Sequence, residues 1–385
     1  MELTYPKTRR MPELDALRGL FLVWMTFTHM PTRFSDFVNQ PFGFVSSAEG
    51  FVFMSALLVS RVYVRDASRD ESGLRVKLWR RTLKIYGYHL LLLVFAFTVA
   101  AAVAATTHRP ALYNLLNFYL AHPVVAIAGS VLLIYCPPLL DILPMYVLFL
   151  FLTPMILTAA IRFGWKRILA VSGAVWLGAQ VGLRALLHNV VVHATRLPIP
   201  LQETGAFNLF AWQGVWIAGL WLGAKSAQGD VPLRRLPKEV IASCGIICLF
   251  FIAVRHGWLG PYLTQDSFKL SLDKWQIGPL RVLNLAAFLV ICHWLRRYLV
   301  RLVAIEPFLT LGKASLQVFC AHVVFVFVGL ALLYQDIPQL HGLRAYGMLL
   351  LTFTGLILVA VREVRLRRAE RKNAAVLRGK KAVAS

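Results

Sequence analysis

The sequence is poor in charged residues and in cysteine, and both shortages limit what the chain can be. Charged residues make up 15% of the chain and apolar residues 58%, which excludes an ordinary soluble domain. The five cysteines are odd in number and lie mostly within apolar stretches, so we expect neither a disulfide framework nor a metal site. The phosphate-binding glycine loop, the nucleophile elbow and the zinc-protease motif are also missing from the sequence.

Acidic residues are scarce as well, with 18 against 41 basic residues and a net charge of +23. This excess does not require nucleic acid as a partner, because basic residues collect on the cytoplasmic side of membrane proteins and face anionic lipid headgroups there. The basic residues fall into clusters between alternate apolar runs. We therefore expect membrane lipids as partners, no nucleic acid, and both termini on the cytoplasmic side.

The apolar residues form runs of the length that a membrane-spanning helix needs, about 20 residues. We predict an all-α, polytopic integral membrane bundle of about ten transmembrane helices. The predicted spans cover residues 14–32, 43–62, 84–106, 139–161, 167–188, 207–224, 239–256, 279–296, 307–333 and 343–361. Segment 111–136 is apolar but is interrupted by polar residues and a proline, so we expect a packed or re-entrant element there.

Outside the apolar runs, the longest polar stretches are the loop at residues 63–83 and the C-terminal tail. Neither is long enough to indicate a separate soluble domain. We predict one membrane domain over residues 1–365. The basic residues 366–385 are predicted to form a disordered cytoplasmic tail that faces lipid.

The first predicted span contains ionisable side chains, which are costly within a membrane and therefore indicate function. Eleven residues separate Arg18 from His29, and on an α-helix this spacing corresponds to roughly 1,100° and a rise of ~16 Å. The two side chains therefore share one helix face, about half a membrane apart. The alternative interpretation is that Arg18 pairs with Asp15 at the interface and that His29 is a satisfied polar residue.

An acyl-coenzyme A donor fits this spacing. Its phosphates prefer guanidinium or ammonium groups, while its thioester lies at the far end of a long arm. Histidine is the side chain best suited to remove a hydroxyl proton near neutral pH.

Several motifs, in order along the chain, resemble one family of membrane enzymes. LDALRGL, followed by His29, resembles the first helix of the acyltransferase-3 superfamily. SSAEGFVFMSALLVSRVY and WRRTLKIYGYHLLL resemble its OpgC branch, the succinyltransferases of osmoregulated periplasmic glucans. Three later segments agree with the same branch, namely YCPPLLDILPMYVLFLFLTPMIL, FNLFAWQGVWIAGLWLG and PFLTLGKASLQVFCAHVVF.

The resemblance implies a membrane O-acyltransferase of the bacterial inner membrane. The implied donor is succinyl-CoA and the implied acceptor is a hydroxyl of periplasmic glucan, with acetyl-CoA and other envelope glycans as the alternatives. Carried over to this sequence, the family pattern makes His29 the catalytic residue and gives Arg18 a role in supporting the donor or the helix of the histidine. Arg81 and Lys84, with Arg80 alongside, would bind the donor phosphates, although positive-inside clustering explains these charges too.

Two acidic residues have two interpretations each. Glu49 begins the second predicted span, on the same side as His29, and could form a histidine-carboxylate dyad or an N-terminal cap favoured by the helix dipole. Asp141 could bind acceptor hydroxyls or mark the start of a helix. Both alternatives remain open on the sequence alone.

Three further residues are predicted to contact the acceptor. Trp212 and Gln213 could offer a stacking face and amide hydrogen bonds to a sugar, although a Trp near a membrane interface is usually a belt residue. His322, within a later span, could line the active cavity or be a satisfied structural residue.

Two other classes of function compete with the enzyme. A transporter of glycan or lipid could use Arg18, Glu49 and His29 as a proton or substrate path, but the sequence contains no evident inverted repeat. A membrane scaffold with a basic face would leave the ionisable residues of the first helix unexplained.

Overall fold

The computed structural model describes residues 11–107, 109–260, 263, 266–333 and 339–383. In these residues the regular structure is helical and no β-strand occurs. The predicted all-α class is therefore confirmed. The two ends of the chain lie outside the described residues, so the predicted side of the termini stays a prediction.

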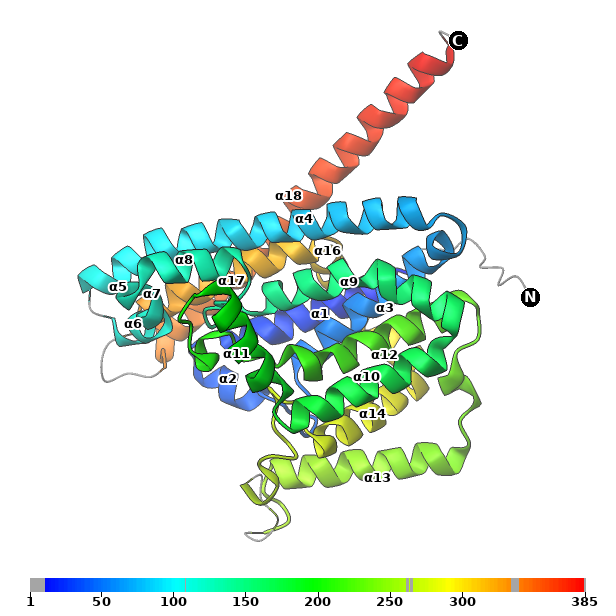
Figure 1. The fold of residues 1–385 in the computed structure, drawn as a ribbon, viewed down its shortest axis with the longest axis horizontal. Helices are drawn as coiled ribbons and strands as arrows, with labels where there is room; N and C mark the ends of the chain where they lie inside the picture. The colour runs from blue at the N-terminus through cyan, green and yellow to red at the C-terminus, as the bar shows by residue number, and fades with distance from the viewer. Residues whose placement is uncertain (1–10, 108, 261–262, 264–265, 334–338, 384–385) are drawn as a thin grey trace.

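The helices form a bundle whose long members run roughly side by side (Figure 1). Aromatic and aliphatic side chains from most of them join one large core. The principal helices are α1 (Pro12–His29), α3 (Ser47–Arg69), α4 (Glu71–Phe95), α9 (Ile142–Phe163), α10 (Trp165–Gln180), α12 (Leu209–Ala227), α13 (Lys238–Arg255), α14 (Pro279–Trp294), α17 (Ser315–Ala331) and α18 (Gly342–Val383).

Helices cover most of each predicted span, but the count of ten membrane crossings is not confirmed. Among the described residues, four helices are long and apolar enough to cross a membrane, or up to six if each bent pair is one span. The chain is a membrane protein by this criterion. The shortfall has a physical cause, since several of the other helices are short or carry charges, as α1 does with Glu13, Asp15 and Arg18.

Two of the predicted spans are interrupted. Instead of one helix over residues 167–188, α10 is followed by α11 (Leu183–Thr195) at an angle of 82°, after a break at Gly182, which has a φ of +96°. Residues 307–333 likewise form α16 (Phe308–Lys313) and α17, separated at Ala314. A count of apolar residues cannot detect local backbone breaks of this kind.

Segment 111–136 is a series of short packed helices rather than a span, which agrees with the predicted packed element. The helices are α6 (Pro110–Leu115), α7 (Asn117–Ala121) and α8 (Pro123–Val131). The Tyr119 hydroxyl donates to the Phe97 carbonyl at 2.9 Å, and the Tyr86 hydroxyl donates to the Val131 carbonyl at 2.8 Å. Both hydrogen bonds join the segment to the long α4 region.

The predicted boundary at residue 365 lies within helix α18, and the assignment of residues 366–385 to a separate tail stays a prediction. Helix α18 continues through this position to Val383, and its far part projects from the bundle (Figure 1). Arg367, just beyond the predicted boundary, donates from Nε to Glu363 at 2.7 Å and from Nη1 to the Lys313 carbonyl at 2.9 Å. These contacts hold α18 against α16 at Arg367.

Close backbone packing at glycine positions sets the spacing of the central helices. A Cβ atom at Gly223 of α12 would lie 2.3 Å from the Leu57 carbonyl oxygen of α3, and one at Gly312 of α16 would lie 1.7 Å from the Asp15 carbonyl oxygen of α1. Both distances are far below van der Waals contact. Glycine is therefore required for α3 and α12, and for α1 and α16, to approach so closely.

We expect Gly223→Ala to lower the free energy of unfolding by about 1–3 kcal/mol, because the added methyl group must push α3 from α12. Gly214 lies on the same helix with no atom within 4 Å of an added Cβ. Gly214→Ala should therefore leave stability unchanged or raise it, since Ala favours helix over Gly. Thermal unfolding of both variants in detergent would measure this difference, and equal midpoints would contradict the packing argument.

Candidate functional site

A cavity of about 700 Å³ lies between the ends of several helices and is strongly basic. Its lining comes from α1, α3, α4, α9, α16, α17 and α18. One acidic side chain, Asp15, lines the cavity with six basic residues, which are Arg18, Arg61, Arg81, Lys84, Lys313 and Arg367. This excess of positive charge suits a ligand with several negative charges.

Arg18 contributes a half-buried guanidinium to the cavity. Its Nε atom is buried without a hydrogen-bond partner, and its guanidinium lies over the Phe51 ring, 5.8 Å from the centroid. The Asp15 carboxylate acts electrostatically on the Arg18 guanidinium, and their predicted pairing stays a prediction. Arg81 and Arg367 are near enough for their charges to repel that of Arg18.

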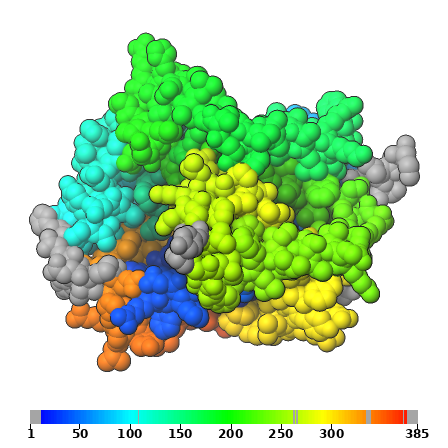
Figure 2. Space-filling model, turned by 90° about the horizontal axis from the view of Figure 1, so that it is seen from below, coloured from blue at the N-terminus to red at the C-terminus, as the bar shows by residue number. Residues whose placement is uncertain are grey.

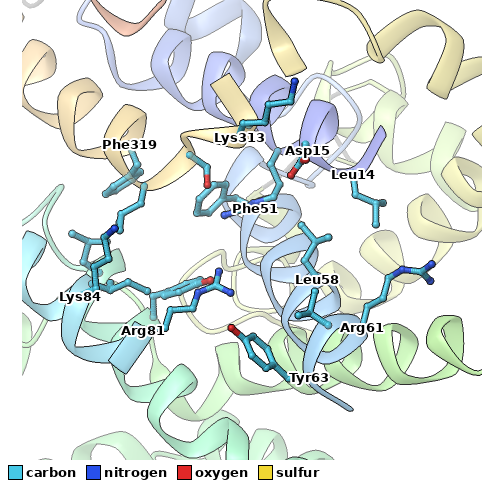
Figure 3. A pocket seen from close by; sticks show the side chains of 18 of the residues that line it. Leu14, Asp15, Phe51, Leu58, Arg61, Tyr63, Arg81, Lys84, Lys313 and Phe319 are labelled. Atoms are coloured by element: carbon cyan, nitrogen blue, oxygen red, sulfur yellow. The ribbon is translucent and has the colours of Figure 1, made fainter. Parts of the chain in front are cut away.

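The basic residues Arg80, Arg81 and Lys84 of α4 do not all face the cavity, as helix geometry requires. Arg81 and Lys84 are three residues apart, so they share a face, and both line the cavity. Figure 3 shows them on one wall, with Leu58 and Arg61 on another. Arg80 is exposed and does not line the cavity, because one residue along a helix turns the side chain by about 100°.

Arg367 is a cavity residue that the sequence did not indicate, because it falls in the predicted tail. Besides its contacts with Glu363 and Lys313, Arg367 donates a hydrogen bond from Nη2 to the Gln317 side chain at 3.2 Å. Gln317 also donates to the Tyr88 hydroxyl at 3.1 Å. The guanidinium is therefore held in one position at the rim of the cavity.

The structure brings together two of the predicted histidines, which lie far apart in the sequence. His29, at the end of α1, and His322, within α17, have Nδ1 and Nε2 respectively 3.1 Å apart, and their rings stack with centroids 5.2 Å apart. His322 is buried, and its Nδ1 has no hydrogen-bond partner in the described part of the chain. The pair can share or pass a proton, depending on the tautomers.

Two aromatic rings connect the basic cavity to the histidine pair. Phe51 and Phe319 both line the cavity and stack with ring centroids 6.3 Å apart. The Phe319 ring also contacts His322, at 5.6 Å between centroids. Arg18, Phe51, Phe319, His322 and His29 therefore form a continuous row of contacts.

Glu49 is fully buried, and both of its oxygens are engaged at the start of α3. Oε2 accepts hydrogen bonds from the backbone and the hydroxyl of Ser46, which form a capping box. Oε1 pairs with Nε of Arg281 at 2.5 Å. The capping interpretation is thus confirmed, and the partner of His29 in the structure is His322 rather than this carboxylate.

Arg281 is a second residue that sequence reasoning missed. It is 2% exposed in the first turn of α14, and besides Glu49 it donates from Nη1 to the Leu272 carbonyl at 3.2 Å. A signal was present in the sequence, since an arginine inside an apolar run requires a partner. Nothing in the sequence identified Glu49 as that partner, because the two residues are 232 positions apart.

Asp141 precedes α9 and is buried, but its side chain makes no helix cap. Its Oδ2 accepts a hydrogen bond from the Ala206 amide at 3.0 Å. Burial raises the pKa of Asp141 to about 6, and the Ala206 hydrogen bond opposes this rise. The adjoining cavity measures about 20 Å³, which is about the room that one water needs and too small for a sugar.

Trp212 and Gln213 are committed to contacts between helices and loops rather than to an open surface. Trp212 is fully buried, and its Nε1 donates to the Trp275 carbonyl at 3.2 Å. The Gln213 amide donates to the Ser172 carbonyl and accepts from the Ser172 hydroxyl, both at 2.8 Å. The predicted stacking face and free amide are therefore occupied in this structure.

Lys274 brings a further positive charge to the end of the bundle that holds His29. It is half-buried in the loop between α13 and α14, and it acts electrostatically on His29 and on Glu49. Figure 2 shows this part of the chain, in yellow, beside the blue α2 (Arg33–Val38) on one face of the molecule. The sequence did not predict this location, because a lysine in a polar loop does not stand out.

Comparison with known proteins identified one family. The family model described as OpgC protein matches residues 10–368 of the chain. No curated protein matches the chain, and no solved structure matches it. In the part of the chain that the structure describes, no three His, Cys, Asp or Glu side chains cluster closely enough to hold a metal ion.

We expect Arg281→Met to lower the free energy of unfolding by about 3–5 kcal/mol, because it leaves the Glu49 carboxylate buried without a cation. Lys77→Met is the control, since it removes one partner of an exposed pair with Asp66 and should leave the thermal midpoint in detergent unchanged. A small effect of Arg281→Met would show that Glu49 is not stabilised by this pair.

Proposed function

The chain belongs to the OpgC protein family, and we propose that it is a membrane O-acyltransferase. The family is associated with acyl transfer and suggests an enzyme that modifies glucan. In our proposal, an acyl group passes from cytoplasmic acyl-CoA, preferentially succinyl-CoA, to a hydroxyl of a periplasmic glucan. The observation that carries the proposal is the row of contacts from the basic cavity to the histidine pair.

The basic cavity is proposed to hold the phosphates of the donor. Phosphate oxygens form charge-assisted hydrogen bonds with guanidinium and ammonium groups, and Arg81 and Lys84 line the cavity with their charges unpaired in the described part of the chain. Lysine at position 84 supplies charge without the bidentate geometry of arginine. The pantetheine arm would then extend past Phe51 and Phe319 toward the histidines.

His29 is proposed to act as the general base. If its Nδ1–H donates to Nε2 of His322, its own Nε2 carries a lone pair and can take the proton of the acceptor hydroxyl. The hydroxyl oxygen then attacks the thioester carbon, the carbon–sulfur bond breaks, and the departing thiolate receives the proton from His29. His322 fixes the tautomer and the ring orientation of His29. The carboxylate of a catalytic triad has the same role toward its histidine.

The basic clusters favour an orientation in which the cavity faces the cytoplasm. Arg18 and the cavity lie at the start of α1, whereas His29 lies at its other end, so the acceptor would approach the histidines from the opposite side of the inner membrane. Both termini would then be cytoplasmic, with α18 extending toward anionic lipid headgroups. Helix α1 thus separates the cavity from His29 along its length, as required if the donor and the acceptor approach from opposite sides of the membrane.

His29→Ala should lower transfer of labelled succinyl groups to periplasmic glucan by about 10²–10⁴-fold, the usual contribution of a general base. Binding of coenzyme A should be unchanged, because the cavity lies at the other end of α1. His322→Phe should lower kcat with little effect on the KM for the donor. Native protein that binds no donor and transfers no acyl group would contradict the enzyme and favour transport.

Arg81→Ala should weaken the binding of succinyl-CoA by about tenfold or more, the effect of losing a hydrogen bond to a charged group. Arg80→Ala removes the same charge one residue away, outside the cavity, and should leave the Kd near the native value. Equilibrium binding at fixed ionic strength would separate the two variants. An equal loss in both would show that general positive charge, rather than the cavity, attracts the donor.

A further inference from the structure

A second hollow, of about 340 Å³, lies at the other end of α18 from the basic cavity. It is lined by the first turns of α18, the end of α17 and the turn before α6, through Arg109, Leu332, Arg344, Gly347, Met348 and Leu351. Arg367, which lines the basic cavity, lies 23 residues beyond Arg344 on the same helix, a rise of ~35 Å. The hollow is therefore a separate site from the proposed donor cavity.

One face of α18 forms a groove within this hollow. Gly347, Met348 and Leu351 follow Arg344 by three, four and seven residues, so all four lie on the same side of the helix. At Gly347 an added Cβ atom would meet no atom within 4 Å, so the missing side chain leaves open space. The groove thus has a cation at its head and an apolar floor behind it.

The charge pattern of α18 sets the depth of the groove in the membrane. Helix α18 is one of the candidate spans, and Arg344 and Arg362 enclose an uncharged run over residues 345–361. Eighteen residues of α-helix rise ~27 Å, close to the ~30 Å of a hydrocarbon core. Tyr346 is 61% exposed, as expected of an aromatic residue at a membrane interface. Arg344 therefore lies at the level of the lipid headgroups, and the apolar floor lies beside the lipid chains.

The charge of the hollow is positive. Among the described residues that line it are two arginines and no acidic residue. Arg109 donates from Nη1 to the Leu333 carbonyl at 3.4 Å, which anchors its guanidinium beside the C-terminal end of α17. Guanidinium groups match the geometry of phosphate oxygens, so the hollow suits a ligand that joins a phosphate to an apolar chain.

We propose that this hollow binds an anionic phospholipid, with its phosphate between Arg109 and Arg344 and one acyl chain in the groove over Gly347. Basic pockets between membrane helices bind lipid headgroups through this chemistry. The proposal does not depend on the acyltransferase function. The bound phosphate would connect the turn before α6 to the start of α18.

The lipid would also support the segment that follows His29. Met348, which lines the hollow, belongs to the same apolar cluster as Met30 and Leu340. The Leu340 amide donates to the Pro31 carbonyl at 2.7 Å. A lipid that holds the start of α18 in place therefore stabilises the packing around the end of α1.

The test measures the binding of phosphatidylglycerol to the delipidated full-length protein in detergent, by mass spectrometry of the intact complex. Arg344→Met should weaken binding by about tenfold or more. Arg33→Met is its control, because Arg33 is an exposed arginine that does not line the hollow. Gly347→Leu should also weaken binding, because its side chain fills the groove, whereas Gly87→Leu adds the same side chain to open space on α4 and should bind lipid as the native protein does.

Three results would overturn the proposal, and each leaves the acyltransferase function untouched. Equal affinity of the native protein for phosphatidylglycerol and phosphatidylcholine would show no preference for an anionic lipid. Equal losses in Arg344→Met and Arg33→Met would show that general positive charge attracts the lipid. Glycerol 3-phosphate that binds as tightly as the lipid would identify a site for a soluble phosphate instead.

Discussion

Burying a carboxylate among apolar helices is tolerable when a cation and hydrogen-bond donors surround it, and Glu49 meets this requirement between Ser46 and Arg281. The same arginine holds the loop that begins at Leu272. The start of α3, the start of α14 and this loop are thus fixed to one another at a single point. The position of Lys274 follows from that anchor because this residue lies in the loop, and Trp212 of α12 holds the same loop through the Trp275 carbonyl.

Local sequence patterns were sufficient for features that depend on one helix at a time. The apolar runs predicted the all-α class, and a spacing of three residues placed Arg81 and Lys84 on one wall of one cavity. The same patterns failed where the backbone breaks, as between α10 and α11, because a break at Gly182 changes direction without changing composition. Residue charge likewise gave no indication of the contacts that Arg367 of α18 makes with Glu363 and Lys313.

Contacts between distant segments could not be predicted from one sequence. His29 and His322 were each singled out by the cost of a polar group in an apolar run, but no pattern indicated that they touch across 293 positions. The location of Lys274 and the pairing of Arg281 with Glu49 came from the tertiary arrangement alone. Nor did the sequence indicate that Trp212, a residue type that often binds sugars, is buried in the core and donates to a backbone carbonyl.

The stacked rings of Phe51 and Phe319 have a consequence for membrane integrity. A protein that accepts one reactant from each side of a membrane must not conduct ions between the two sides. The rings separate a water-accessible, positively charged chamber from a pair of protonatable side chains, and apolar contacts of this kind offer no hydrogen-bonded path for a proton. The stacked rings therefore oppose the leakage of protons, and a donor arm that reaches the histidines has to pass between them or displace them.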